Sequence, residues 1–257
     1  MNAPGYRVIE HLSRTNRLDT YEVWSEERAC SCVAKALRPD VRSDERAREA
    51  LIHEATRLIE LAHPHIVRGY ELITEPELVF IMETLDGETL AHLVDRSPGG
   101  LPAEDVAWLG IHLTSALRYL HHRGLLHLDV KASNVIAEGG RAKLLDLSLA
   151  RPQGNHKAGI GTWSNMAPEQ ARGGEVGPAA DVWGLGTVLY EAATGEPAFD
   201  DDGRVSVEYP QLHVPPPSAR GHVPAALSDV IDGCLQVDPA ARPTLEEVME
   251  RLRPLAT

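Results

Sequence analysis

The chain has 257 residues, of which 43% are apolar and 25% are charged, a composition typical of a folded globular protein and not of a disordered chain. The 25 basic and 38 acidic residues give a net charge of −13, and the acidic residues are spread along the chain. This balance argues against a nucleic acid or an anionic membrane as partner, because either requires a basic patch, although a few local cations can still hold a nucleotide phosphate.

The first third of the chain is expected to form a β-sheet that carries one helix. Short strand-like runs extend from residue 6 to about residue 82. A helix is predicted over 43–62, because a capping residue followed by acids opens it and apolar side chains recur at helical spacing as far as Ala62. The apolar run 78–82 then predicts a buried strand.

After Gly87 the pattern becomes helical. Residues 103–123 repeat apolar side chains at helical spacing, with Pro102 near the start and Gly124 just past the end. A second helix over 181–194 is apolar on nearly every side and is therefore expected to be buried. A mainly β half followed by a mainly α half predicts an α+β fold of two lobes with a cleft between them.

One acidic residue of the predicted helix over 43–62 lies on its inward face. Glu54 follows Leu51 by three residues and precedes Leu58 by four. A carboxylate at such a position requires a cationic partner, and Lys35, in a strand-like run, is the obvious candidate. Taken alone, the two residues are interpreted as a structural ion pair.

Four polar residues follow the helix predicted over 103–123 and are flanked by Leu, Val and Ile. They are Asp129, Lys131, Asn134 and Asp146. We expect these groups to converge in a partly buried place, since a polar turn explains one of them but not four. Carboxylate and amide oxygens suit Mg²⁺, and an ammonium group suits a phosphate.

In order along the chain, these motifs resemble those of the protein Ser/Thr kinases, and most of all the bacterial cytosolic ones, from about Tyr6 to Leu255. The residues that carry the resemblance are Lys35, Glu54, His127 to Asn134, Asp146, Ala167-Pro168-Glu169, and Asp181 to Gly186. Each motif alone is weak, but their order is specific. The resemblance implies a single protein kinase domain over 1–257 with a protein-kinase-like fold. A small, mostly β N-lobe with one helix (about 1–84) and a larger, mostly helical C-lobe (about 85–257) would have an ATP cleft between them.

The resemblance also assigns catalytic roles. Lys35, held by Glu54, would bind the α- and β-phosphates of ATP. Asp129 would orient the substrate hydroxyl and accept its proton, while Lys131 would neutralise the γ-phosphoryl group. Thr162 would bridge Asp129 and Lys131, and together with Lys131 it indicates Ser or Thr, not Tyr, as the acceptor.

The resemblance further implies a site for ATP and magnesium. Asn134 and Asp146 would hold Mg²⁺, for which Mn²⁺ is an alternative. The remaining ATP contacts would come from a slot around the base (Leu12, Thr20, Ala34 and Ile136), from Met82 as gatekeeper, and from Glu83, Thr84 and Leu85 as a hinge whose main chain pairs with adenine. Three other matches are expected to be scaffold: an ion pair of Glu169 with Arg242, and Asp181 holding the backbone of the catalytic loop.

The most serious departure from the family pattern is the loop that covers the phosphates. Residues 13–20 align with a glycine-rich segment of the family but contain no glycine. Glycine permits close approach of the backbone to phosphates, so we expect a looser loop over ATP and a weak affinity for the nucleotide. Arg14 and Arg17 either add side-chain contacts to phosphate or are simply solvated.

A second departure concerns activation. Leu128 replaces the arginine against which a phosphorylated activation loop docks in the family, and residues 149–163 contain a single hydroxyl side chain, Thr162. The sequence therefore predicts that no activation-loop phosphorylation is required. Residues 200–223 contain poor helix formers, so the helix that normally docks protein substrates is expected to be short or missing.

The function predicted from these motifs is ATP- and Mg²⁺-dependent transfer of a phosphoryl group to Ser or Thr of a protein substrate. One alternative is a pseudokinase that binds nucleotide or acts as a scaffold, which the missing glycines favour and the complete catalytic set opposes. Another is a small-molecule kinase of the aminoglycoside phosphotransferase type, opposed by Lys131, Thr162 and the A-P-E match at 167–169.

The expected location is the cytoplasm, and neither nucleic acid nor membrane is expected as a partner. Cys30, Cys32 and Cys234 suggest neither a disulfide framework nor a zinc site. No segment approaches the length of a membrane span, and the first ten residues lack the apolar core of a signal peptide.

Overall fold

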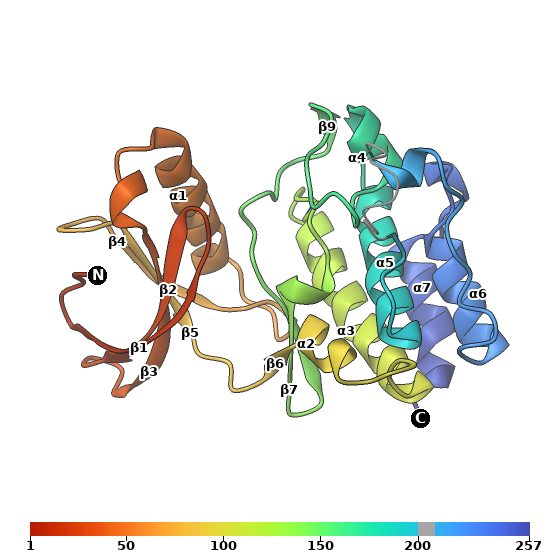
Figure 1. Ribbon diagram of the computed structural model, residues 1–257, viewed down its shortest axis with the longest axis horizontal. Coiled ribbons are helices and arrows are strands. Elements are labelled where there is room, and N and C mark those ends of the chain that lie inside the picture. Colours follow the sequence, from red (N-terminus) through yellow and green to blue (C-terminus); the bar gives the residue numbers. More distant parts are fainter. Residues whose placement is uncertain (200–208) are drawn as a thin grey trace. The chain divides into compact units, whose positions relative to one another are not determined.

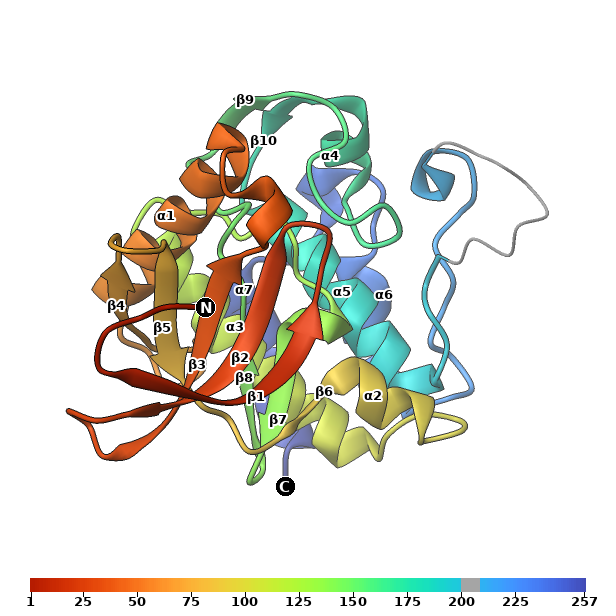
Figure 2. The ribbon, with the colours of Figure 1, turned by 60° about the vertical axis from the view of Figure 1, so that its left-hand side comes forward.

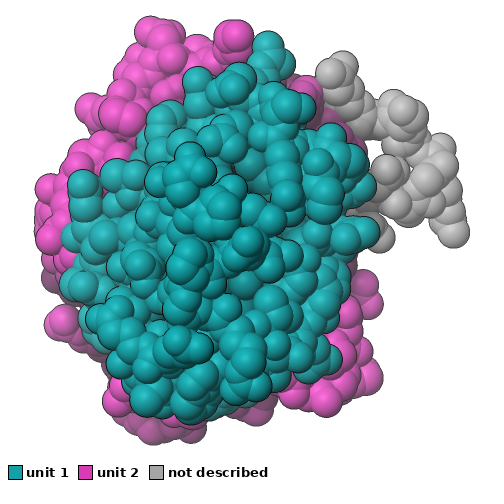
Figure 3. Space-filling model, turned by 90° about the vertical axis from the view of Figure 1, so that its left-hand side faces the viewer, with its two compact units in different colours: residues 1–86, 146–148 teal, residues 87–145, 149–257 magenta. Residues whose placement is uncertain are grey.

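The computed structural model describes residues 1–199 and 209–257, and the chain divides into two compact units (Figure 1). The N-terminal unit comprises residues 1–86 together with 146–148. The C-terminal unit comprises 87–145 and 149–257, and Figure 3 distinguishes the two by colour.

The N-terminal unit is an antiparallel five-stranded sheet with one α-helix. The sheet has the order β1-β2-β3-β5-β4, which Figure 2 shows side by side. Its elements are β1 (Tyr6–Arg14), β2 (Leu18–Ser25), β3 (Cys30–Leu37), α1 (Glu45–Glu60), β4 (Gly69–Ile73) and β5 (Val79–Glu83).

The two faces of this sheet have different roles, because successive side chains of a strand point to opposite sides. One face forms an apolar core that includes Val23, Cys32, Ala34, Ala36, Val79 and Ile81. Lys35 lies between two of these residues on β3 and therefore projects from the other face, where it meets a side chain of α1. The sheet thus separates its apolar core from its polar site.

Helix α1 (Glu45–Glu60) is shorter than the predicted 43–62 at both ends. The side chain of Asp44 accepts hydrogen bonds from the backbone N–H groups of Arg46 and Ala47, which caps the helix. The expected extension to Ala62 is wrong, since Leu61 is already extended and Pro64 disfavours helical backbone just before it. The inward stripe over Leu51, Glu54, Ala55 and Leu58 is nevertheless buried as expected.

Gly69 allows β4 to approach α1 closely. A Cβ at this position would lie 2.8 Å from the backbone of Leu58 and Ile59, a distance that real Cβ atoms do not reach. A glycine is therefore required where the strand crosses the helix.

The C-terminal unit is mainly helical, so the α+β prediction is confirmed. Its helices are α2 (Leu90–Asp95), α3 (Ala103–His121), α4 (Pro168–Arg172), α5 (Ala179–Thr194), α6 (Ala225–Cys234) and α7 (Leu245–Leu252). Helix α5 is buried on nearly every side, as predicted, and packs against α3 and α6. None of the helices in 1–199 and 209–257 is both long and apolar enough to cross a membrane.

Short strands within this unit were not predicted. They are β6 (Glu88–Thr89), β7 (Val135–Glu138) and β8 (Arg141–Leu144) in one sheet, and β9 (Gly154–His156) paired with β10 (Gly174–Val176) in another. The β7–β8 turn is Gly139-Gly140, both with positive φ, which is a hairpin signal that sequence reasoning overlooked.

The predicted shortening of the substrate-docking helix concerns residues 200–223. Residues 200–208 lie outside the described residues. From 209 to 223 the structure contains a single 3₁₀ turn, Pro210–Leu212, and no α-helix.

Candidate active site

The predicted pair of Lys35 and Glu54 is confirmed as an ion pair in the N-terminal unit. The Nζ atom of Lys35 lies 2.5 Å from Oε1 of Glu54, and the Glu54 side chain is almost fully buried. Burial acts to lower the pKa of Lys35, but the negative charges of Glu54 and Asp146 outweigh it, so that the net pKa is raised. The ammonium group is therefore held charged and in a fixed place.

The structure contradicts the assignment of Ala34 to the slot around the base. Ala34 belongs to the apolar core on the face opposite Lys35, because adjacent residues of a strand alternate. Val33 is the residue that shares the face of Lys35. The register places Thr20 opposite Lys35 and Met82 opposite Val33, so both of these predicted residues do lie on that face.

The predicted hinge follows the end of β5. The backbone N–H of Glu83 donates to the carbonyl of Arg68, whereas no hydrogen bond of the Leu85 backbone occurs within the described residues. The Oγ1 atom of Thr84 is buried and has no hydrogen-bond partner there either. A segment with an orphaned buried hydroxyl and free main-chain groups fits a polar ligand such as adenine.

The other two residues predicted for the slot lie apart in the chain. Leu12 is half-exposed at an irregularity in the β1–β2 pairing. Ile136 belongs to β7 of the C-terminal unit, where it pairs with Lys143.

The catalytic loop of the C-terminal unit brings four predicted residues together. Oδ1 of Asp129 accepts hydrogen bonds from Oγ1 of Thr162 at 2.6 Å and from the Thr162 backbone N–H at 2.9 Å. Nζ of Lys131 lies 2.5 Å from Thr162 Oγ1 and 2.9 Å from Asp129 Oδ2. The bridging position expected for Thr162 is confirmed.

Asn134 completes this network and retains an oxygen for a metal ion. Its amide Nδ2 donates to both the carbonyl and Oδ2 of Asp129, each at 3.0 Å. The amide nitrogen is thus turned toward Asp129, and the amide oxygen is left as an acceptor. An amide oxygen is a suitable ligand for Mg²⁺.

Asp146, in the N-terminal unit, has a strained backbone with φ of 55°. The backbone N–H of Ser148 donates to its Oδ1 at 2.9 Å, and Arg57 of α1 donates to the carbonyl of Leu147 at 3.4 Å. These contacts hold the carboxylate in place. A carboxylate oxygen held in this way is a suitable ligand for Mg²⁺.

Asp181 is confirmed as the carboxylate that holds the catalytic loop. Buried on α5, it accepts hydrogen bonds at 2.8 Å from the backbone N–H groups of His127 and Leu128. Leu128 has φ of 64°, so these bonds fix an unfavourable backbone conformation. Sequence reasoning missed His121, whose Nε2 lies 2.7 Å from Oδ2 of Asp181, because nothing local links residues 60 apart.

The predicted ion pair of Glu169 and Arg242 is also confirmed. The guanidinium group makes two hydrogen bonds to the carboxylate, of 2.6 and 2.9 Å, and donates to the carbonyls of Ala179 and Gln236. Since the Arg242 side chain is fully buried, this pair is a fixed part of the unit's interior.

The segment between Asp146 and Glu169 is ordered by main-chain and amide contacts. Strand β9 pairs with β10, with His156 opposite Gly174. The side chain of Gln170 donates to the carbonyls of Leu128, at 2.9 Å, and of Ile160, at 2.7 Å. The Leu128 side chain itself is buried and apolar, so it offers no cation to a phosphate.

A hollow of about 230 Å³ adjoins the catalytic loop within the C-terminal unit. Lys131, Thr162 and Asn165 line it, as does Glu191 of α5. Burial, and to a smaller extent the charge of Asp95, raises the pKa of Glu191 from 4.5 to about 7.

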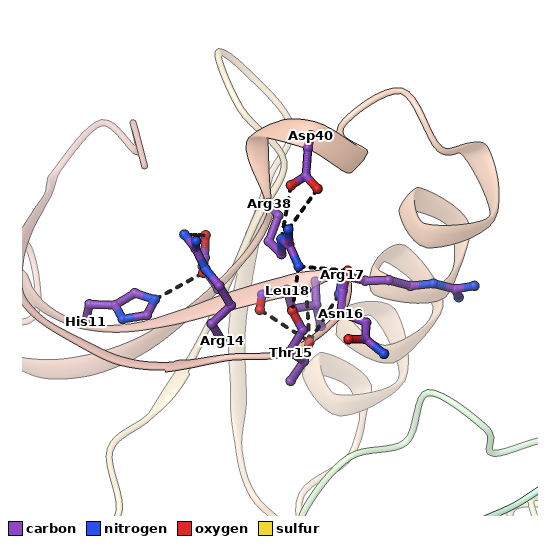
Figure 4. Close-up of polar contacts among 9 residues, drawn as sticks. His11, Arg14, Thr15, Asn16, Arg17, Leu18, Arg38 and Asp40 are labelled. Atoms are coloured by element: carbon purple, nitrogen blue, oxygen red, sulfur yellow. Dashed lines mark hydrogen bonds and ion pairs between the residues drawn. The ribbon is translucent and has the colours of Figure 1, made fainter.

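The segment predicted to cover the phosphates is a turn closed by its own hydrogen bonds. Residues Thr15–Arg17, which we call the β1–β2 turn, join β1 to β2. The Thr15 backbone N–H donates to the carbonyl of Leu18 at 2.8 Å, and the Leu18 N–H donates to Thr15 Oγ1 at 3.0 Å (Figure 4). A threonine side chain therefore closes the turn where the family has glycine.

The N-terminal unit thus contains a lysine–glutamate pair, and the C-terminal unit contains an aspartate–lysine–threonine network. Groups of both kinds are used by enzymes that transfer a phosphoryl group from a nucleoside triphosphate. Residues 6–252 match the protein kinase domain family, and the chain belongs to this family, which confirms the resemblance of its motifs.

Curated bacterial relatives cover most of this chain. PkaA of Streptomyces coelicolor, a serine/threonine-protein kinase, is 34% identical over 235 residues, which are 86% of this chain and 42% of that protein. PknB of Mycobacterium leprae, also a serine/threonine-protein kinase, is 33% identical over 223 residues, 81% of this chain and 36% of PknB. A probable serine/threonine-protein kinase of Clostridium perfringens is 29% identical over 218 residues, 81% of this chain and 32% of the relative. The chain thus spans about a third to two fifths of the length of these relatives.

Proposed function

We propose that the protein transfers the γ-phosphoryl group of ATP to a Ser or Thr hydroxyl of a protein substrate, with Mg²⁺ as cofactor. The observation that carries this proposal is the network in which Thr162 joins Asp129 to Lys131. It supports a serine or threonine acceptor, as in the bacterial relatives, and it contains every group that the transfer requires on the acceptor side.

In the proposed reaction the oxygen of the substrate hydroxyl forms a bond to the γ-phosphorus, and the bond from that phosphorus to the bridging oxygen of ADP breaks. Asp129 orients the hydroxyl and accepts its proton. Lys131 lies 2.9 Å from Asp129 Oδ2, so the same ammonium can offset negative charge on the transferred group. Catalysis then consists mainly of positioning and charge neutralisation.

On the nucleotide side, Lys35 would contact the α- and β-phosphates. Its ion pair with Glu54 supports this role, because it keeps the ammonium charged and limits its motion. The free backbone of Leu85 and the Thr84 hydroxyl would contact the base. Magnesium, held by Asn134 and Asp146, would neutralise phosphate charge when bound.

We further propose that activity needs no phosphorylation between residues 149 and 163. The β9–β10 pairing and the amide bonds of Gln170 support this, because they order the segment without a phosphate. Leu128 supports it as well, since an apolar buried side chain provides no phosphate-binding cation. Phosphatase treatment followed by an assay tests the idea, and a loss of activity together with a phosphosite in this segment would refute it.

The central experiment measures label transfer from γ-labelled ATP and Mg²⁺ to the protein itself and to a generic basic protein. Asp129→Asn should abolish transfer, whereas Asp105→Asn, a matched change at an exposed position of α3, should leave it unchanged. If the wild type binds ATP but transfers no label to any protein substrate, the pseudokinase reading replaces this proposal.

The cysteines bear on the proposed location. Cys30, Cys32 and Cys234 are all unpaired, which supports the cytoplasm as the compartment in which the protein acts.

A further inference from the structure

Most backbone N–H groups of the β1–β2 turn already donate hydrogen bonds to acceptors in or next to the turn. The N–H groups of Thr15 and Leu18 are bonded within the turn, and the Arg17 N–H lies 3.4 Å from Thr15 Oγ1. A glycine-rich loop binds phosphate through such N–H groups. In this chain, phosphate recognition from the turn must therefore come from a side chain.

Arg38, just after β3, supports the turn through both its backbone and its side chain. Its backbone N–H donates to the Arg17 carbonyl at 3.0 Å, and its side chain donates to the carbonyls of Thr15 and Asn16 at 3.3 and 3.4 Å. Asp40 in turn holds the Arg38 guanidinium through two hydrogen bonds, of 2.8 and 3.0 Å (Figure 4). These hydrogen bonds fix the backbone around Arg17 in the absence of a ligand.

The arginines around the turn differ in whether their guanidinium groups already have hydrogen-bond partners. Arg14 makes two hydrogen bonds to Asp19, of 2.6 and 3.1 Å, and hydrogen bonding to Arg14, with a smaller effect of His11, lowers the pKa of Asp19 to about 2. Arg38 is committed to Asp40. Arg17 makes no side-chain hydrogen bond or ion pair with any residue of 1–199 or 209–257, and Figure 4 shows its side chain extending away from the turn toward α1.

Arg17 also lines a hollow of about 300 Å³ within the N-terminal unit. The turn forms one side of this hollow, Ala47, Ala50 and Leu51 of α1 form another, and Glu54 and Ser148 complete it. Glu54 is the partner of Lys35, and Ser148 donates its N–H to Asp146. The unpaired cation of the turn therefore faces the same place as the two groups proposed for phosphate and metal.

We propose that the Arg17 guanidinium binds the β- and γ-phosphates of ATP and replaces the backbone contacts of a glycine-rich loop. This inference rests on the proposed ATP-dependent function. Guanidinium groups suit phosphate because they donate two parallel hydrogen bonds. Arg17 and Glu54 are the charged residues that line the hollow, and since Glu54 is already paired with Lys35, Arg17 is the cation left to meet phosphate charge.

The test compares affinities for ATP and adenosine, measured by calorimetry with Mg²⁺, in the wild type, Arg17→Gln and Arg7→Gln. Arg7 is the matched control, an exposed arginine at the far end of β1 that does not line the hollow. Arg17→Gln should weaken ATP binding about tenfold, the value of one charge-assisted hydrogen bond, and leave adenosine binding unchanged. Its melting temperature without ligand should equal that of the wild type, since Arg17 holds nothing else in place.

The outcomes separate this inference from the proposed function. If the wild type binds ATP and Arg17→Gln binds it equally well, Arg17 does not contact phosphate and only this inference is overturned. An equal loss for ATP and adenosine would overturn it as well, because the effect would not concern phosphate. If the wild type binds adenosine but gains nothing from the phosphates of ATP, or binds neither, the proposed function falls together with the inference.

Discussion

Replacing Glu191 by glutamine should remove a pH-dependent part of the protein's stability. Glu191 is half-buried on α5, and within the described residues its carboxylate has no hydrogen bond or ion pair to compensate for the loss of water. Its pKa is raised from 4.5 to about 7 in the folded protein, so between these pH values the folded state binds more protons than the unfolded state. Stability contributed by this group is therefore complete below pH 4.5 and is lost as the pH rises through 7.

The size of the effect follows from the shift. The unfolded carboxyl is already largely ionised at pH 5, so part of the loss occurs below that pH. Between pH 5 and pH 8 the free energy of unfolding should fall by about 2.5 kcal/mol. Urea unfolding of the wild type, Glu191→Gln and the exposed control Glu175→Gln at these two pH values measures it. Between pH 5 and pH 8, the free energy of unfolding of Glu191→Gln should fall by about 2.5 kcal/mol less than that of the wild type or of Glu175→Gln. Equal pH dependence of all three proteins would refute the reasoning.

Further predictions concern the networks around the catalytic loop. Thr162→Ala should lower kcat about 10- to 100-fold, the value of a charge-assisted hydrogen bond, whereas Thr162→Ser should retain most of the rate. If both variants lose kcat to the same extent in steady-state phosphorylation assays, the hydroxyl does not have the bridging role. Glu169→Gln leaves Arg242 buried without its counter-charge, so it should reduce the free energy of unfolding by about 3 kcal/mol, as measured by urea unfolding. A reduction below about 1 kcal/mol would show that the charge of Glu169 contributes little to stability. Arg38→Lys keeps the charge but loses the paired bonds to Asp40, so it should raise the KM for ATP severalfold while kcat changes less; an unchanged KM would mean that the turn does not need this brace.

Local chemistry made much of the fold predictable. The start of α1 follows from its capping residue, and the burial of α5 follows from its uniformly apolar composition. The contact between Lys35 and Glu54 could be predicted because a carboxylate on an inward helical face has few ways to be satisfied, and the order of the motifs then supplied the catalytic network.

Other features required information that no local pattern contains. Arg38 reaches the β1–β2 turn across more than twenty residues, and His121 reaches Asp181 across 60, so neither contact has a signal in its own neighbourhood. The error at Ala34 is of a different kind. Alternation along β3 was available from the sequence and would have placed Val33, and not Ala34, beside Lys35.

The pairing of β9 with β10 has a consequence for the energetics of substrate encounter. It joins His156 to Gly174, so the segment from 157 to 173, a loop that ends in helix α4, has both of its ends fixed. Such a loop loses its conformational entropy once, when the C-terminal unit folds, and not at each encounter with a substrate. Thr162 lies inside this loop. Under the proposed function, a protein substrate would meet a segment whose two ends are already fixed, so ordering that segment would subtract less from the free energy of binding.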